Sequence, residues 1–330
     1  MGFGPNPSYT SLLRILGRQA GLPKWGADYL PSHFLSDPDT PKVTRPSEVF
    51  WPLVARYIQA QALTERPFIL LALHCTWLSE LLEQKMLPFN SAPHLLTGHP
   101  RAEGLVLPPM RGTLAIADEM GVLNRHPMVR APRDHPISPN QLLPYPYVGD
   151  VLLVLSDLRG PYCKNWTIKK TMQDFERTFK NRNKPPSDED KESAQIRFEI
   201  EKRCYLDGNI QTHALVPSMI DRELRINLQT LHYWWARNPE SIATLSIEKE
   251  MLAWYREQIP KIRIQFDLAN DGAKKFKTSV YDAKWVLKKG IFSRCLLVDL
   301  FQAVTDNLPL FPERESPFER YAVWFAREAL

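Results

Sequence analysis

The chain has 330 residues, of which 44% are hydrophobic and 24% charged, and its formal net charge is +5. This ordinary globular composition excludes collagen-like and disordered chains, and the length favours two domains, since domains commonly hold roughly 100–200 residues. No apolar run reaches the roughly 20 residues of a membrane-spanning helix, and the mild basic surplus permits contact with phosphates without requiring it.

The four cysteines are far apart and form no Cys-x-x-Cys motif, so they predict neither a zinc site nor a disulfide framework. We therefore expect a protein of the reducing cytoplasm, with no signal peptide and no membrane association. Proline (29) outnumbers glycine (14), which indicates many rigid irregular connections. The cysteines are Cys75, Cys163, Cys204 and Cys295.

The first segments of the chain alternate between irregular and apolar stretches. Residues 1–45 are rich in Pro, Ser and Gly, and we expect an arm that wraps the surface or meets a partner. From Ser47 to Leu63, apolar residues recur at helical spacing and predict a helix. The apolar run 67–74 suits either a buried strand or the beginning of a long helix, and we favour the strand.

Two glutamates follow in what we predict to be a helix over 76–86. Thr76 can cap this helix, and Glu80 and Glu83 lie off its buried face. Acids near a helix start can serve a metal site. Alternatively, they are surface glutamates that complement the helix dipole.

The middle of the chain is largely irregular. We predict a strand at 104–107 and a short helix at 113–121 that is closed by glycine. His126 and His135 lie in a long proline-rich connection at a spacing that matches no metal motif, so we interpret them as structural or exposed.

The stretch from Asp150 to Lys169 predicts a β-hairpin. Two β-runs flank the turn Asp157-Leu-Arg-Gly160. Because side chains alternate across a strand, Trp166 and Ile168 should lie on one face, and Thr167 and Lys169 on the other.

A metal-dependent nuclease of the restriction-enzyme type needs an acid before one strand and a polar-x-Lys sequence on the next strand. Asp150 can help to hold a hard divalent cation, and Lys169 can orient a water or offset charge on a phosphate. The alternative is a strand edge with a solvated lysine.

After the hairpin we predict a helix at 172–180, an exposed polar insertion at 181–192, a helix at 195–206 that Asp207-Gly208 ends, and a strand at 211–216. A strand, a helix and a strand in this order build an α/β sheet of the kind that carries such nuclease sites.

The last third changes to helices with aromatic faces, so we divide the chain into the arm 1–45, a catalytic domain 46–218 and a C-terminal domain 219–330. A helix that ends in Lys-Lys-Gly and is followed by short extended runs indicates a winged-helix-like module that contacts DNA or protein. The alternative is a solvated charged face. The basic residues are Lys274, Lys275, Lys277, Lys284, Lys288, Lys289 and Arg294.

Four segments in order resemble a known family. They are 17–31, which ends in Asp-Tyr-Leu-Pro; 107–127, with Leu-Pro, Ile-Ala, Gly and His-Pro; the hairpin 150–169 with Gly160-Pro161; and 198–203, Phe-Glu-Ile-Glu-Lys-Arg. Together they are similar to TnsA, the endonuclease subunit of heteromeric, Tn-seven-like bacterial transposases.

The resemblance implies an α/β, restriction-endonuclease-like core of PD-(D/E)xK type. It implies Mg²⁺-dependent cleavage of the 5′ strands at transposon ends, with Mn²⁺ as a substitute, in double-stranded DNA. A DDE-type transposase subunit would join the 3′ strands, and an AAA+ ATPase regulator would be a further partner in the bacterial cytoplasm.

Residue by residue, Asp150 stands where the family has its metal-binding aspartate, and Lys169 where it has the lysine of Gln-x-Lys. The glutamate of the preceding helix best matches Glu80, with Glu83 as the competing choice, so Glu80 and Asp150 are the predicted metal ligands. Glu201 matches a further acid near the family's site.

The chain departs from the family at the glutamine, which is Thr167 here and completes the predicted catalytic set of Glu80, Asp150, Thr167 and Lys169. Its hydroxyl is shorter and neutral but can hold a water. Strand alternation favours Lys169 over Lys170 as the site lysine.

Two other functions stay open. The protein could be chiefly a scaffold subunit with a weakened site, which recruits the transposase and the AAA+ regulator. It could also be an unrelated helix-rich DNA-binding regulator, although that leaves the hairpin unexplained.

Overall fold

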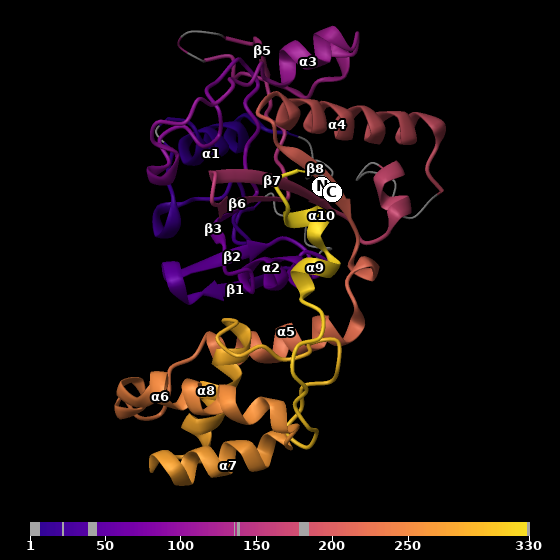
Figure 1. Ribbon diagram of the computed structural model, residues 1–330. Coiled ribbons are helices and arrows are strands. Elements are labelled where there is room, and N and C mark those ends of the chain that lie inside the picture. Colours follow the sequence, from indigo (N-terminus) through magenta and orange to yellow (C-terminus); the bar gives the residue numbers. More distant parts are fainter. Residues whose placement is uncertain are drawn as a thin grey trace. The chain divides into compact units, whose positions relative to one another are not determined.

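The computed structural model describes residues 7–21, 23–38, 45–134, 136, 139–177 and 185–328, which form a mixed α/β protein (Figure 1). No helix in these ranges is long and apolar enough to cross a membrane. The chain divides into two compact units. The first comprises 1–48, 57–66 and 77–217, and the second 49–56, 67–76 and 218–330.

A four-stranded sheet forms the centre of the first unit, in the order β3, β6, β7, β8. The first three strands are antiparallel, and β8 is parallel to β7. The parallel pair needs a crossover, which the helix α4 provides. The bounds are β3 Leu78–Glu83, β6 Val151–Asp157, β7 Gly160–Ile168, α4 Asp188–Asp207 and β8 Gln211–Leu215.

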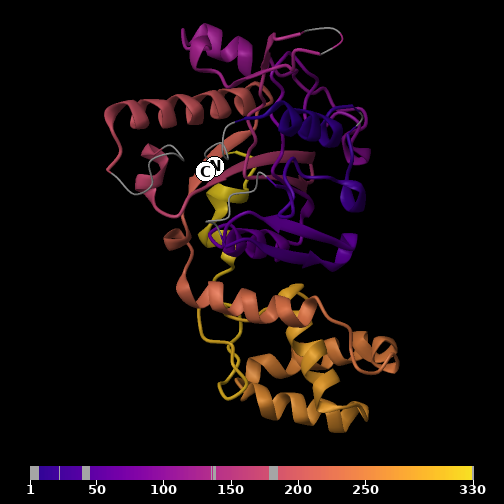
Figure 2. The same ribbon diagram turned by 180° about the vertical axis from the view of Figure 1, so that it is seen from behind.

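Both faces of this sheet are covered, because consecutive residues along β6 and β7 are buried. On one face, Ile200 and Cys204 of α4 pack with Leu152 and Val154 of β6. The helix α3 (Thr113–Glu119) contributes to the same core, and Figures 1 and 2 show it beside α4.

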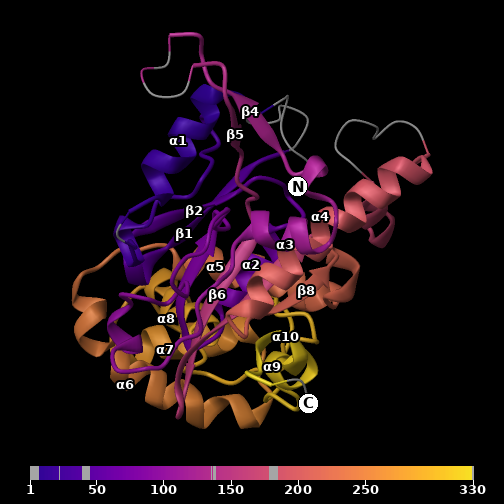
Figure 3. The same ribbon diagram turned by 90° about the horizontal axis from the view of Figure 1, so that it is seen from above.

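The N-terminal arm packs as part of the first unit. Its helix α1 (Tyr9–Gln19) buries Leu12 and Ile15 against Val129 and Tyr145. These two residues come from or follow the small antiparallel sheet of β4 (Met128–Arg130) and β5 (Leu142–Pro144), which Figure 3 shows beside α1.

The second unit is built mainly from helices, with α8 packed against α5, α6 and α7. Single β-bridges join Ile264 to Pro309 and Val298 to Pro312. The α-helices of its segment 218–330 are α5 Arg222–Trp235, α6 Ala243–Gln258, α7 Gln265–Phe276, α8 Val280–Phe292, α9 Pro317–Arg320 and α10 Ala322–Phe325.

The predictions for residues 47–86 are wrong. The expected helix from Ser47 is a two-stranded sheet of β1 (Ser47–Trp51) and β2 (Arg56–Ala60). The expected strand at 67–74 is the helix α2 (Arg66–Leu73), and the expected helix at 76–86 is β3. Because β3 buries residues on both faces, it lacks the alternating pattern that marks a half-buried strand.

Other predictions are confirmed: the hairpin, the glycine-closed helix α3, the helix that ends at Gly208 and the strand β8. Residues 104–107 are irregular rather than a strand, and only a 3-10 helix, Met172–Glu176, forms within 172–177. Residues 188–192 belong to the first turns of α4, where Ser187 and Asp190 form a capping box.

Candidate functional site

Asp150 immediately precedes β6, and its carboxylate joins the two ends of the hairpin. Its Oδ2 accepts a hydrogen bond of 2.7 Å from the backbone N–H of Ile168 and lies 3.5 Å from the Lys169 Nζ. The strand register produces this contact, since Val151 lies opposite Trp166. Asp150 is 1% exposed and the Lys169 side chain 20%, so solvent reaches the pair from the lysine side.

The surroundings of Asp150 favour its charged form. Burial raises its pKa, but the nearby Lys169 charge, the Ile168 N–H bond and the Arg197 charge together lower the pKa below its usual value. Asp150 is therefore ionised at neutral pH.

Glu65 is the second acid of the site. It immediately precedes α2, is 2% exposed, and accepts a hydrogen bond of 2.9 Å from the backbone N–H of Gln61. Burial first, and the charge of Asp150 second, raise its pKa, while Lys169 acts in the opposite direction. Glu65, Asp150 and Lys169 therefore form one electrostatic cluster in which the two acids repel each other.

Glu80, the acid predicted from the sequence, lies elsewhere. It is on β3 opposite Val154, four residues from Asp150 along β6, or about 13 Å at roughly 3.3 Å per residue. Its Oε2 accepts a hydrogen bond of 2.9 Å from the Gly26 N–H, and its Oε1 is 3.9 Å from His99 Nε2. Glu65, by contrast, is the glutamate whose pKa the charge of Asp150 raises.

Glu83, the competing choice, is fully buried at the end of β3. Its position opposite Val151 brings its backbone near the site, but alternation directs its side chain to the face of Val151 rather than that of Asp150. Its Oε1 accepts a hydrogen bond of 3.1 Å from the Gln59 N–H.

Thr167 lies on the same face of β7 as Asn165, and both bond to Glu201 of α4. The Thr167 hydroxyl donates to Glu201 Oε1 over 2.7 Å, and the Asn165 amide donates to the same oxygen over 2.9 Å. All three are buried. The Thr167 hydroxyl thus links β7 to α4, and α4 covers this face of the strand.

Arg197 of α4 is a second cation close to Asp150. Its guanidinium donates to the Val148 carbonyl over 3.4 Å and lies 5.7 Å from the ring centre of Tyr147. Its charge contributes to the lowered pKa of Asp150. The sequence reasoning did not single out this residue.

The donor set suits a hard cation. Within the described ranges, no cluster of three or more His, Cys, Asp or Glu side chains is placed to hold a metal. Glu65 and Asp150 offer carboxylate oxygens only, which Mg²⁺ prefers, and Mg²⁺ commonly takes one or two protein carboxylates and completes its shell with waters and phosphate. The repulsion between the two acids is the kind that a divalent cation relieves.

The predicted basic cluster of the C-terminal region separates into four residues that pair with acids, one of which is Arg294 with Glu313 at 2.8 Å, and three exposed lysines. Lys284 and Lys288 bond to Asp306 at 2.6 and 2.9 Å, and Lys289 bonds to Glu248 at 2.7 Å. The other lysines, which are exposed, surround the end of α7 and are Lys274, Lys275 and Lys277.

His126 is buried and structural. Its Nε2 lies 2.9 Å from the Thr113 hydroxyl and its Nδ1 3.1 Å from the Pro127 carbonyl. His135, which was grouped with it, lies outside the described residues.

Glu65 carried a signal that could have found it. Pro67 stands in the first turn of α2, where proline is favoured because its missing N–H would have no partner there. Recognising Pro67 as a helix start would have put Glu65 at the head of the helix that precedes the sheet.

Comparisons with known proteins do not assign the chain to a family. No family model matches it, and no curated protein matches its sequence.

Proposed function

We propose that the chain is a Mg²⁺-dependent DNA endonuclease of the TnsA type, which cuts the 5′ strands at transposon ends. The observation that carries this proposal is the 3.5 Å contact of Lys169 with the buried Asp150, to which the second buried acid, Glu65, is coupled electrostatically. Carboxylates can hold a hard divalent cation and a nearby ammonium can orient a water, which are roles that metal-dependent phosphodiester hydrolysis can use.

The fold supports the same conclusion. The hairpin carries an acid before its first strand and a lysine after its second, and a crossover helix leads to a parallel fourth strand. This arrangement is consistent with a restriction-endonuclease-like core.

Glu65 and Asp150 would hold Mg²⁺, which when bound neutralises charge on the phosphate and polarises the scissile bond. Lys169 would orient the attacking water, because its ammonium carries three donors, lies 3.5 Å from the Asp150 carboxylate and belongs to a side chain that is 20% exposed. Arg197 adds positive charge on the α4 side. Thr167 supports the site indirectly, through Glu201.

The second unit supports an accessory role in DNA or protein contact. α7 ends at Phe276, Lys277 takes a left-handed backbone with φ 51°, and Ser279 caps α8, so the two helices form a helix-turn-helix. The single bridges beside it are consistent with a small wing. We propose that this winged-helix-like module and the exposed α7 lysines serve contacts with DNA, the transposase and the AAA+ regulator.

A matched pair of variants tests the site. We expect Glu65→Gln to reduce cleavage of a duplex that carries the transposon ends, with the transposase present, by at least about 100-fold. Glu80→Gln, a change of the same size on β3, should stay within about twofold of the wild type. Equal activity of Glu65→Gln and the wild type would reject the assignment of Glu65.

The scaffold function is the second candidate, and one observation favours it: the Thr167 hydroxyl is bonded to Glu201. Calorimetry with Mn²⁺ separates the two functions. Binding in the millimolar range or tighter, lost in Asp150→Ala, supports the nuclease. Absence of binding, even with DNA present, supports the scaffold.

A further inference from the structure

The segment from β2 to α2 supplies backbone N–H groups to both buried acids nearby. The N–H of Gln61 donates to Glu65 Oε2 over 2.9 Å, and the N–H of Gln59 donates to Glu83 Oε1 over 3.1 Å. Glu65 lies in the turn between β2 and α2 rather than in a strand. The position of its carboxylate therefore depends on how the Gln61 backbone is held.

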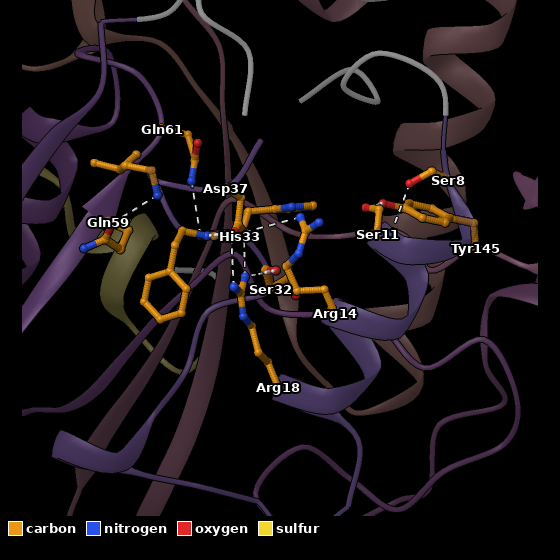
Figure 4. A network of polar contacts seen from close by, with 12 residues as sticks. Ser8, Ser11, Arg14, Arg18, Ser32, His33, Asp37, Gln59, Gln61 and Tyr145 are labelled. Carbon is orange, nitrogen blue, oxygen red and sulfur yellow. Dashed lines mark hydrogen bonds and ion pairs between the residues drawn. The ribbon is translucent and has the colours of Figure 1, made fainter. Parts of the chain in front are cut away.

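The side chains of the same two glutamines attach this segment to the arm. The Gln61 amide donates to the His33 carbonyl over 3.2 Å, and the Gln59 side-chain oxygen accepts from the Leu35 N–H over 3.3 Å. Both glutamines are buried. Figure 4 shows them reaching the turn 32–37 from one side.

Arg18 of α1 holds that turn from the other side. Its guanidinium forms a two-pronged bond to Asp37, at 2.6 and 2.8 Å, and also donates to the Ser32 carbonyl over 3.0 Å (Figure 4). Asp37 in turn accepts a bond of 2.8 Å from the Phe34 N–H. Two-pronged Arg–carboxylate pairs are geometrically specific, so the turn has a defined shape.

We propose that Gln61 is a positioning residue for Glu65, and that the turn 32–37, held by Arg18, is its anchor. This inference rests on the proposed function of Glu65 as a metal ligand. The order of contacts is Arg18, the turn, the Gln61 side chain, the Gln61 backbone and the Glu65 carboxylate. The arm thereby supports the metal site.

Gln61 and Gln59 provide the matched test. Both side chains bond to the turn, but only the Gln61 backbone bonds to Glu65. We expect Gln61→Ala to weaken Mn²⁺ binding, measured by calorimetry on the full chain, by about tenfold or more, as is usual when a ligand's supporting bond is lost. Gln59→Ala should bind Mn²⁺ within about twofold of the wild type.

A variant that loses Mn²⁺ affinity but keeps its cleavage rate at saturating Mn²⁺ distinguishes a positioning residue from one with a general structural role. Because Gln61→Ala keeps Glu65, Asp150 and Lys169, its cleavage rate at saturating Mn²⁺ should return to within about threefold of the wild type. A persistent loss of rate at saturation, or equal weakening of Mn²⁺ binding in both glutamine variants, would overturn the inference.

Arg18→Lys tests the anchor if Gln61→Ala does not fold. A lysine keeps the charge but cannot form the two-pronged bond, so Mn²⁺ binding should weaken in the same direction, and unchanged binding contradicts the inference. If the wild type itself binds no Mn²⁺, the proposed function fails and the inference with it. If the wild type binds and the variants match it, only the inference fails.

Discussion

Both units contain ion pairs between lysines and acids, but the distances and partners of these pairs differ. In the second unit, Lys284 and Lys288 share Asp306 and Lys289 pairs with Glu248, all at 2.6–2.9 Å. In the first unit, Lys169 is 3.5 Å from Asp150, and Glu65 adds a second acid to the same cluster. The short pairs bring each lysine into direct contact with a carboxylate, whereas Lys169 is farther from Asp150, and a second buried acid, Glu65, has its pKa raised by burial and by the charge of Asp150.

The largest expected effect separates two neighbouring lysines. We expect Lys169→Ala to lower the cleavage rate by about 100-fold or more, because it removes the ammonium beside Asp150. Lys170→Ala, at the exposed next position, should stay within about twofold. Rates on the same duplex at saturating Mg²⁺ measure both, and a larger loss in Lys170→Ala would move the site by one residue.

The short ion pairs of the second unit should matter for stability instead. Asp306→Asn weakens the bonds to Lys284 and Lys288, and hydrogen bonds to charged groups contribute about 1.5–3 kcal/mol. Because Asp306 is partly exposed, we expect the unfolding free energy in urea to fall by about 1–2 kcal/mol. Mn²⁺ affinity should not change, and a loss of affinity would show that these lysines serve the site.

Thr167 is close to the site, as Lys169 is, but its hydroxyl is bonded within the protein, to Glu201, as the carboxylate of Asp306 is bonded to lysines. Thr167→Val keeps the shape and removes one hydrogen bond, so urea unfolding should show a loss of about 1 kcal/mol. Mn²⁺ affinity should stay within about twofold. A tenfold loss of affinity with unchanged stability would instead give the hydroxyl a direct role at the metal.

The smallest expected effect is the pH dependence of folding stability that Asp37 of the N-terminal arm contributes. Burial raises the pKa of Asp37, but its bonds and charge contacts with Arg18 and the Phe34 N–H lower it below the usual 3.8. A lowered folded pKa adds stability that is complete above about pH 4 and is lost as pH falls through the folded pKa. The stability difference between wild type and Asp37→Asn should therefore shrink from pH 7 to pH 3 in urea titrations. A constant difference would show that the pair contributes no pH-dependent stability.

Part of the site was predictable from local sequence. The turn Asp157–Gly160, where Gly160 takes φ 101°, and the alternation along β7 define the hairpin, and hairpin register places Asp150 beside the residues at its other end. The hairpin was therefore correctly expected, and its register brings Lys169 within 3.5 Å of Asp150.

The other acid was not predictable in the same way. Residues 67–86 contain two apolar runs whose periodicity does not distinguish a helix from a strand buried on both faces. With the two runs exchanged, the sequence analysis looked for an acid in a helix over 76–86 and chose Glu80, which lies in β3, and it did not consider Glu65, which precedes α2.

The sequence by itself determined the elements whose signals are local: the hairpin with its glycine turn, α3 with Gly121 after it, the C-terminal part of α4 with its end at Gly208, and β8. Only the tertiary structure decided which acid meets Asp150 and which lysines are paired. The physical reason is that these outcomes depend on burial and on contacts between residues far apart in the chain, which no local pattern records.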